Sequence, residues 1–224
     1  VCNLFDWARN VDSVEKIIQV STDEVYGPAL NDHRHTEWLD LHLPSNPYSA
    51  SKSAQESIAF SYWRTYGLPI LITNTMNIFG EMQDPEKFIP LVIRRIINNE
   101  IITIHGTLNG TIGSRFYLHA RNQADALLYI LGLNFTKYPD VDKPLKFNVV
   151  GDKEVNNLEL VELISKFIGQ DFKYEIVDFH SSRPGHDLRY ALNGEKLKNL
   201  GWRPPVEFES SLLKTVNWTI ANSE

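Results

Sequence analysis

Three consecutive residues that can exchange protons or donate hydrogen bonds, Thr22, Asp23 and Glu24, follow a short hydrophobic segment, KIIQV (16–20). That segment is typical of a buried strand. In doubly wound sheets, ligands bind beyond the carboxyl ends of the strands, which is where these side chains would lie. Two carboxyl groups in unlike environments can supply one acid and one base. The stretch therefore predicts acid–base chemistry at the end of a strand.

A purely structural interpretation of the same stretch is a helix cap. Ser21 and Glu24 have the spacing of a capping box, in which two side chains satisfy the first donors of a helix. Gly27 and Pro28 would end such a helix within about one turn. Both interpretations stay open on the sequence alone.

A second candidate is Tyr48-x-x-x-Lys52, near the start of a predicted helix. Residues four apart lie on one helix face, and a nearby ammonium lowers the pKa of a tyrosine toward that of a usable base. The alternative is an accidental pair on an amphipathic helix, since so short a motif is weak by itself. Its position after the strand and the Ser21–Thr22 pair favours chemistry.

Hydrophobic periodicity predicts alternating strands and helices around these residues. The expected strands are 16–20, 68–75, 101–105, 145–150 and 172–178, and the expected helices are 1–10, 46–67, 84–100, 120–133, 156–169, 193–200 and 208–222. Strands separated by helices indicate parallel pairing. We therefore expect an α/β fold, a partial doubly wound (Rossmann-like) parallel sheet with a smaller C-terminal α/β lobe.

Composition limits the classes of binding partner and the cellular compartment that we expect for this protein. The 224 residues carry a formal net charge of −6, which argues against non-specific binding to nucleic acid. No apolar run approaches the ~20 residues of a membrane span. The single cysteine, Cys2, excludes a disulfide framework within the chain and favours a reducing, cytoplasmic compartment. His33, His35 and His42 lie in one segment without a convincing ligand set, so we expect no metal.

Several longer segments carry a family resemblance: VSTDEVYG, NPYSASKSAQE, RTYGLP, PEKFIPLVI, RPGHDLRYAL, LGWRPPVEFE and TVNWTI. Together they resemble the nucleotide-sugar 4,6-dehydratases of the extended short-chain dehydrogenase/reductase superfamily, and most of all those that act on dTDP-glucose. The resemblance runs from Val1 to about Ile220. STDEVYG is its most specific part, because epimerases of the superfamily usually carry other residues at Asp23 and Glu24, and decarboxylases keep only part of the stretch.

The resemblance implies a role for each candidate. Tyr48 takes the proton of the sugar C4 hydroxyl while hydride passes to NAD⁺, and Thr22 hydrogen-bonds the C4 oxygen. Glu24 then removes the C5 proton and Asp23 protonates the departing C6 hydroxyl, after which hydride returns to C6. The cofactor-binding residues implied are Ser21, Tyr48 and Lys52, with Lys52 lowering the Tyr48 pKa.

The substrate implied is a nucleotide-diphosphate sugar. The residues implied to bind it are Asn77, Glu86, Lys87, Arg115, Asn157, Arg183 and His186. Arg115 and Arg183 suit a diphosphate because a guanidinium fork matches phosphate oxygens, and surface solvation is the alternative. At two places, Ile78 and Phe116–Tyr117, the sequence differs from the usual motif of the family. These differences leave the nucleotide base and the sugar of the substrate undetermined.

NAD⁺ binding in this fold needs a glycine-rich turn after the first strand. The glycines of GTLNGTIG (106–113) have a spacing similar to that of such a turn. However, polar residues and Arg115 follow them where an apolar helix would be needed, so we predict a loop that carries Arg115. We expect the true turn upstream of Val1, in a missing portion on the order of 100 residues. The implied division is 1–78 and 119–151 for the remaining NAD-binding domain, and 79–118 and 152–224 for the nucleotide-sugar lobe.

The family also implies a homodimer through helices 1–10 and 50–66. The alternatives to a dehydratase are an epimerase or decarboxylase of the same superfamily, and an inactive fragment that binds sugar nucleotides without turning them over.

Overall fold

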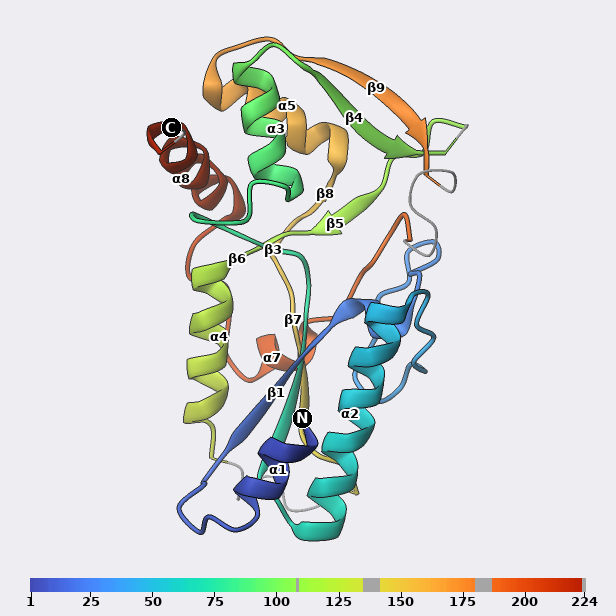
Figure 1. Cartoon of the computed structure of the whole chain (residues 1–224), viewed down its shortest axis with the longest axis vertical. Coiled ribbons are helices and arrows are strands. Elements are labelled where there is room, and N and C mark those ends of the chain that lie inside the picture. The colour runs from blue at the N-terminus through green and yellow to red at the C-terminus, as the bar shows by residue number, and fades with distance from the viewer. Residues whose placement is uncertain (108, 135–141, 180–186, 223–224) are drawn as a thin grey trace. The chain divides into compact units, whose positions relative to one another are not determined.

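The computed structural model describes residues 1–107, 109–134, 142–179 and 187–222 (Figure 1). The chain divides into two compact units. Unit 1 comprises Val1–Met76, Ala124–Val150 and Ala191–Arg203, and unit 2 comprises Asn77–Gln123, Gly151–Tyr190 and Pro204–Glu224. We had placed the C-terminal part from 152 onward in one lobe, whereas the structure assigns Ala191–Arg203 to unit 1. The functional roles of the two parts stay predictions.

Unit 1 is built on a parallel sheet of three strands. β1 (Ile17–Thr22), β2 (Ile70–Thr75) and β7 (Lys146–Val149) lie in the order β1-β2-β7. All six β2 residues are buried, as expected of a central strand covered on both faces. Thr22 is in register with Thr75, and Thr75 with Val149, so the carboxyl ends of the three strands align. This confirms the predicted parallel α/β fold.

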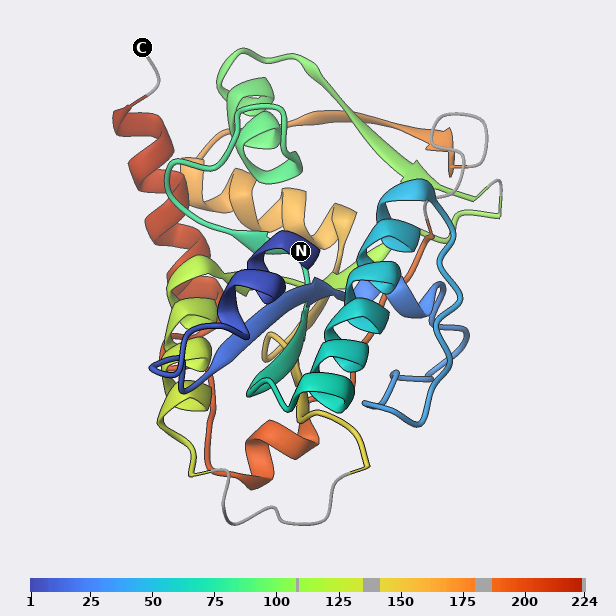
Figure 2. The same cartoon turned by 60° about the horizontal axis from the view of Figure 1, so that its bottom comes forward.

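The described helices of unit 1 are α1 (Cys2–Ala8), α2 (Pro47–Tyr66), most of α4 (Ala120–Gly132) and α7 (Glu195–Asn199). The long helix α2 runs beside β1 and β2 (Figure 2). It begins with a capping box, in which the Asn46 side chain accepts from the Ser49 N–H, and it ends at Gly67 in the left-handed conformation. The predicted helix over 46–67 is therefore confirmed almost to the residue.

A single turn of 3-10 helix, η1 (Asp23–Tyr26), follows β1 directly. Its N-cap is Thr22, whose hydroxyl accepts from the Glu24 N–H at 3.4 Å. The Ser21–Glu24 capping box is therefore wrong, because the cap lies one residue later. The turn rotates the chain away from the strand direction, which lets neighbouring side chains face the same side.

Gly27 ends this turn in a conformation that only glycine adopts readily, with φ 74 and ψ −158. An added Cβ would lie 2.3 Å from the Leu43 carbonyl oxygen. We expect Gly27→Ala to lower the free energy of unfolding by about 3 kcal/mol, measured by urea denaturation. Gly67→Ala is the matched control: φ is +67 there, but nothing lies within 4 Å, so we expect a loss of only about 1 kcal/mol. Equal losses would contradict the steric argument.

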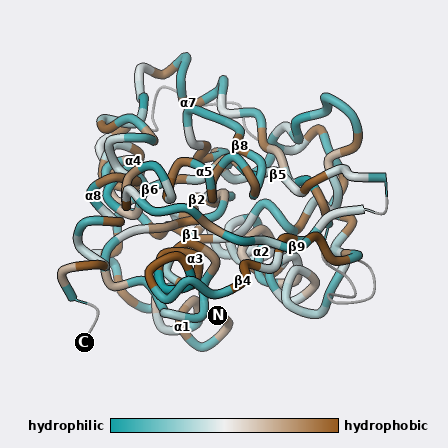
Figure 3. The backbone as a smooth tube through the Cα atoms, turned by 90° about the horizontal axis from the view of Figure 1, so that it is seen from above, coloured by the Kyte–Doolittle hydropathy of each residue, from teal (hydrophilic) through white to brown (hydrophobic). Residues whose placement is uncertain are grey.

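Unit 2 combines short strands with helices. A parallel pair joins β4 (Ile101–Gly106) to β9 (Lys173–Asp178), another joins β3 (Ile78–Phe79) to β6 (Leu118–His119), and β5 (Ser114–Phe116) pairs antiparallel with β8 (Glu154–Asn156). The helices are α3 (Phe88–Ile97), α5 (Asn157–Ile168) and α8 (Phe208–Ala221). Their apolar faces share one buried core, and the hydrophobic colouring of α3 is plain in Figure 3.

The predicted long elements of unit 2 are confirmed, and the differences have local causes. α3 begins at Phe88 rather than at 84, because Asp84 instead holds a turn in which it accepts from the Glu86 and Lys87 N–H groups. β3, β5, β6 and β8 were not predicted, since two or three residues are too few to show a period. No helix among the described residues is both long and apolar enough to cross a membrane.

Candidate active site

The Thr22 hydroxyl lies at the centre of the predicted acid–base residues. It donates to Asp23 Oδ1 at 2.9 Å and also hydrogen-bonds the Tyr48 side chain. Thr22 and Asp23 are 7% and 5% exposed, whereas Tyr48 is 53% exposed. Residues from the end of β1, from η1 and from the first turn of α2 therefore converge, and the phenol remains open to a ligand.

Glu24 is fixed from the other side of the same turn. Its Oε2 accepts a hydrogen bond from Asn46 Nδ2 at 3.1 Å. Asn46 is also the N-cap of α2, so one residue links the start of that helix to the candidate base. The two carboxyl groups thus have unlike surroundings: Asp23 is buried against a hydroxyl, and half-buried Glu24 is held by an amide. Such a difference is what an acid–base pair requires.

The pKa of Tyr48 is raised above its ordinary value, first by burial and then by the negative charge of Glu24. The hydrogen bond between the Thr22 and Tyr48 side chains acts in the opposite direction, and the negative charge of Asp23 raises the pKa. The family resemblance implies instead a lower Tyr48 pKa caused by Lys52. Among the described groups Lys52 is not a cause, because its ammonium donates to the Val20 carbonyl oxygen at 3.3 Å. The charges that act on Tyr48 are those of η1.

Ser21 and Lys52, the residues expected to bind a cofactor, lie at the same end of β1. The Ser21 side chain is 3% exposed, and its buried hydroxyl has no hydrogen-bond partner within the described part of the chain. Such an orphaned hydroxyl fits a site that a polar ligand group completes. The Lys52 ammonium donates to the carbonyl oxygen of Val20, the residue before Ser21. A hydroxyl and an ammonium at neighbouring positions are suited to hydrogen-bond the hydroxyl groups of a ribose.

Two of the predicted substrate residues, Arg115 and Asn157, meet in unit 2. They line a hollow of about 60 Å³ together with Gly113, Asp187 and Leu188. The Arg115 guanidinium donates to the carbonyl oxygens of Ser114, Asp187 and Leu188 and lies 4.6 Å from the centre of the Tyr190 ring. Asn157 Oδ1 accepts from the Tyr117 hydroxyl at 3.0 Å. The GTLNGTIG loop does lead into the strand that carries Arg115, as predicted.

Three further predicted substrate residues, Asn77, Glu86 and Lys87, are not among the residues that line that hollow. Asn77 is exposed, and its carbonyl accepts from the Leu118 N–H. Glu86 and Lys87 are exposed in the turn before α3. Arg183 and His186 lie outside the described residues. Their roles in substrate binding stay predictions.

Sequence reasoning missed three polar residues that support the site: Asn46, Asn74 and Glu56. Asn74 Nδ2 donates both to the Thr22 carbonyl oxygen at 2.9 Å and to Glu56 Oε1 at 2.7 Å. A signal was present, because Glu56 is four residues beyond Lys52 on the face that also carries Tyr48. An asparagine two residues after the apolar run ILI (70–72) of a predicted buried strand was the second signal.

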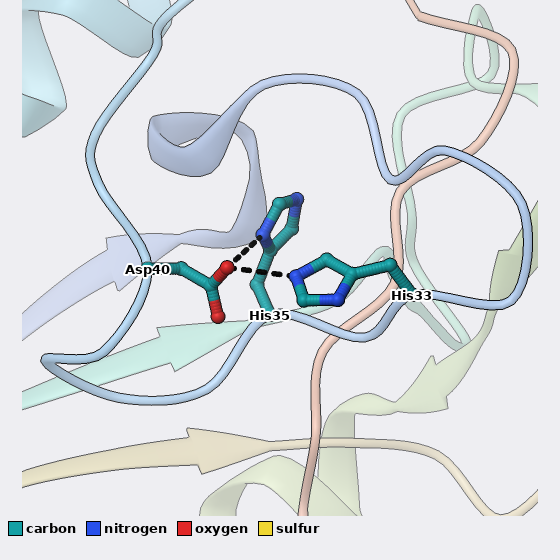
Figure 4. Close-up of side chains that lie close together, drawn as sticks. All are labelled: His33, His35 and Asp40. Atoms are coloured by element: carbon teal, nitrogen blue, oxygen red, sulfur yellow. Dashed lines mark hydrogen bonds and ion pairs between the residues drawn. The ribbon is translucent and has the colours of Figure 1, made fainter.

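His33, His35 and Asp40 lie within ligand distance of one another in unit 1 (Figure 4). Asp40 Oδ1 lies 2.7 Å from His33 Nε2 and 3.4 Å from His35 Nδ1, and Asp40 Oδ2 accepts from the Thr36 N–H. Asp40 thus pairs with both histidines, but among the described residues neither ring nitrogen of buried His35 has a hydrogen-bond partner. His42, which we had grouped with these histidines, instead contacts Ser53 and Glu56.

Comparison with known proteins shows the family of the chain. Residues 1–215 match the family model described as GDP-mannose 4,6 dehydratase. dTDP-glucose 4,6-dehydratase 1 of Escherichia coli (strain K12) is 35% identical over 219 residues, which are 92% of this chain and 58% of that protein. dTDP-D-glucose 4,6-dehydratase of Homo sapiens is 35% identical over 210 residues, 92% of this chain and 56% of that protein. The chain therefore spans less than two thirds of the length of these relatives.

Solved structures show the same relationship. The dTDP-glucose 4,6-dehydratase of Bacillus anthracis str. Ames, solved in complex with NAD, superimposes with a TM-score of 0.84 at 34% identity, covering 99% of this chain and 66% of that one. The UDP-glucose 4-epimerase of Thermus thermophilus, also solved with NAD, has a TM-score of 0.85 at 25% identity and covers 99% and 68%. Since the family model covers nearly the whole chain, the chain belongs to the 4,6-dehydratase family that this model describes.

Proposed function

We propose that the chain carries the catalytic residues of an NAD-dependent dehydratase. The substrate is a nucleotide-diphosphate hexose, with dTDP-glucose favoured by the relatives, and the product is the 4-keto-6-deoxy sugar. The observation that supports this most is the convergence of Thr22, Asp23 and Tyr48 on one hydroxyl, with Glu24 close enough to act on the Tyr48 pKa. An elimination beside a ketone needs a base that acts at one carbon of the sugar and an acid that acts at the neighbouring carbon. Side chains of adjacent residues on one turn can reach both carbons.

The proposed roles are those that the family resemblance implies. Tyr48, the exposed phenol, takes the proton of the C4 hydroxyl, and the Thr22 hydroxyl holds the C4 oxygen. Glu24 removes the C5 proton, which the 4-ketone acidifies, and Asp23 gives a proton to the departing C6 hydroxyl, so that one water leaves. A proton then returns to C5.

NAD fits the residues at the end of β1. The orphaned Ser21 hydroxyl and the Lys52 ammonium are suited to hold the nicotinamide ribose beside Tyr48. When bound, NAD⁺ supplies the hydride acceptor for C4, and the reduced form supplies the hydride for C6. Structural relatives crystallised with NAD support this choice of cofactor.

The mass of the product tests the proposal. The chain, and in parallel the product of the complete reading frame that encodes it, is incubated with NAD⁺ and either dTDP-glucose or UDP-glucose. Dehydration removes one water, epimerisation leaves the mass unchanged, and a decarboxylase would release carbon dioxide from a uronic acid substrate. We expect loss of water from dTDP-glucose; unchanged mass with an altered sugar configuration would instead establish an epimerase. Binding of the nucleotide sugar without turnover by either protein would establish an inactive binding module.

Glu24→Gln tests the role of the candidate base. The amide keeps the size of the side chain but cannot accept the C5 proton, so we expect dehydration to slow by about 100-fold. Exchange of the C5 hydrogen with solvent deuterium, followed by NMR, should slow in parallel. Glu15→Gln, at an exposed position before β1, is the control and should leave both rates unchanged. Normal C5 exchange in Glu24→Gln would contradict the assignment.

A homodimer through residues 1–10 and 50–66 is part of the proposal. α1 and α2 pack together through the Phe5 and Tyr62 rings, 5.4 Å apart, and expose Leu4, Trp7 and Tyr66. Exposed large apolar groups gathered on one helix pair favour an interface.

Light scattering after size exclusion measures this pairing. We expect a mass twice 25.7 kDa for the unaltered chain and a monomer for Trp7→Glu. Leu39→Glu is the control, because Leu39 is 81% exposed but lies outside both helices, and it should remain dimeric. A monomeric unaltered chain would overturn the interface.

The cytoplasm is the proposed location. Cys2 is an exposed free thiol, and such a group persists most readily in a reducing compartment.

A further inference from the structure

We propose that Asn74, oriented by Glu56, is a positioning residue that holds the Thr22–Glu24 turn in its working geometry. Asn74 touches neither acid nor base directly. It acts through the Thr22 carbonyl, at the point where β1 becomes η1. This deepens the proposed function of the same site, and it rests on that function only for its effect on turnover.

The contacts of Asn74 are specific. The residue is fully buried in β2, and its Nδ2 donates to the Thr22 carbonyl oxygen at 2.9 Å and to Glu56 Oε1 at 2.7 Å. A primary amide has two N–H donors, so both are used. Asn74 is in register with Ser21, one residue before Thr22, and its side chain therefore joins β2 to the last peptide group of β1.

Glu56 fixes which way this amide points. Its side chain is 2% exposed, and its second oxygen, Oε2, lies 2.7 Å from Lys146 Nζ, itself 1% exposed. His42 Nε2 approaches the same oxygen at 3.4 Å. A carboxylate held by a buried ammonium has little freedom to rotate, so it presents Oε1 to Asn74 as a fixed acceptor.

The consequence for the site follows from the position of Thr22. The Thr22 carbonyl belongs to the peptide that leads into Asp23, and the Thr22 hydroxyl contacts both Asp23 and Tyr48. Losing the bond to Asn74 frees that peptide plane to rotate, and the hydroxyl and the first residue of η1 rotate with it. Small displacements of positioned groups cost catalysis heavily.

The neighbouring strand offers a matched control. Asn148 of β7 pairs with Asn74 in register, is equally buried, and donates instead to the carbonyl oxygens of His35 and Asn193 at 2.9 and 3.0 Å. Asn74→Leu and Asn148→Leu therefore each remove a buried amide with two donors, from adjacent strands. Only Asn74→Leu removes the hydrogen bond to the Thr22 carbonyl oxygen. Circular dichroism and thermal unfolding establish that each variant is folded. If either leucine variant fails to fold, Asn74→Ala and Asn148→Ala replace the pair.

The primary readout does not require turnover. The pKa of Tyr48 is measured by NMR of ¹³Cζ-labelled tyrosine, with Tyr48→Phe assigning the signal. The charges that face this phenol are Glu24 and Asp23 of η1, and Thr22 is the group that lowers its pKa. Loss of the Thr22 hydrogen bond in Asn74→Leu is expected to raise the Tyr48 pKa further, whereas Asn148→Leu should titrate like the unaltered chain. In the turnover assay we expect kcat to fall between about ten- and a hundredfold for Asn74→Leu, with KM unchanged.

The outcomes separate this inference from the proposed function. A Tyr48 pKa that is unchanged in Asn74→Leu, or shifted equally in Asn148→Leu, overturns the positioning role. A shift confined to Asn74→Leu supports it, even if the unaltered protein converts no nucleotide sugar, in which case only the proposed function fails.

Discussion

Tyr48→Phe is expected to lower the turnover of dTDP-glucose by about a thousandfold, within the 10²–10⁴ range of a lost general base. Phenylalanine keeps the ring but removes the phenol oxygen that is proposed to take the C4 proton. Substrate affinity should change little, because the loss falls on the chemical step. The measurement is steady-state kcat and KM for the variant and the unaltered protein.

The pH profile makes this prediction sharper. Tyr48 works as a base only when deprotonated, so the rate should rise with pH, and a raised pKa moves that rise to higher pH. In Tyr48→Phe the dependence on this ionisation should disappear. Tyr174→Phe, at a position 46% exposed in unit 2, is the control and should keep the full rate and profile. If Tyr48→Phe kept the full rate or the full pH profile, Tyr48 would be excluded as the base.

Lys146→Met is expected to lower the free energy of unfolding by about 3–5 kcal/mol, as is usual when one partner of a buried ion pair is removed. Lys146 Nζ lies 2.7 Å from Glu56 Oε2 and 4.7 Å from the centre of the Tyr26 ring. Methionine fills a similar volume, but it leaves the Glu56 charge buried without its closest cation. Urea denaturation measures the loss.

A double variant distinguishes charge imbalance from lost packing. Burial lowers the pKa of Lys146 more than attraction to Glu56 raises it, so desolvation outweighs the pairing. Lys146→Met combined with Glu56→Gln should therefore be less destabilised than the sum of the single variants. Lys153→Met is the control for an exposed pair, since Lys153 and Glu209 are 51% and 56% exposed, and it should cost less than about 1 kcal/mol. Strict additivity in the double variant would show that packing is responsible.

The strands and helices of more than a few residues could be predicted from the sequence, because each has a local cause. The hydrophobic run before Ser21 predicted β1, and Pro47 with Gly67 marked both ends of α2. The sequence also singled out the candidate acid and base, whose catalytic roles stay predictions. The resemblance carried by STDEVYG and Tyr48-x-x-x-Lys52 identified the family, which the comparisons confirmed.

Tertiary structure alone decided which groups act on one another. Lys52, adjacent to Tyr48 in the helical repeat, turns to the Val20 carbonyl, so the Tyr48 pKa is governed by charges in η1 instead. Asn74 is more than 50 residues from Thr22 in sequence, and only the parallel register of β1 and β2 brings its amide to the Thr22 carbonyl. Local sequence determines the elements because their signals are short-range. The polar contacts that tune the site depend on strand order and register, which no local pattern encodes.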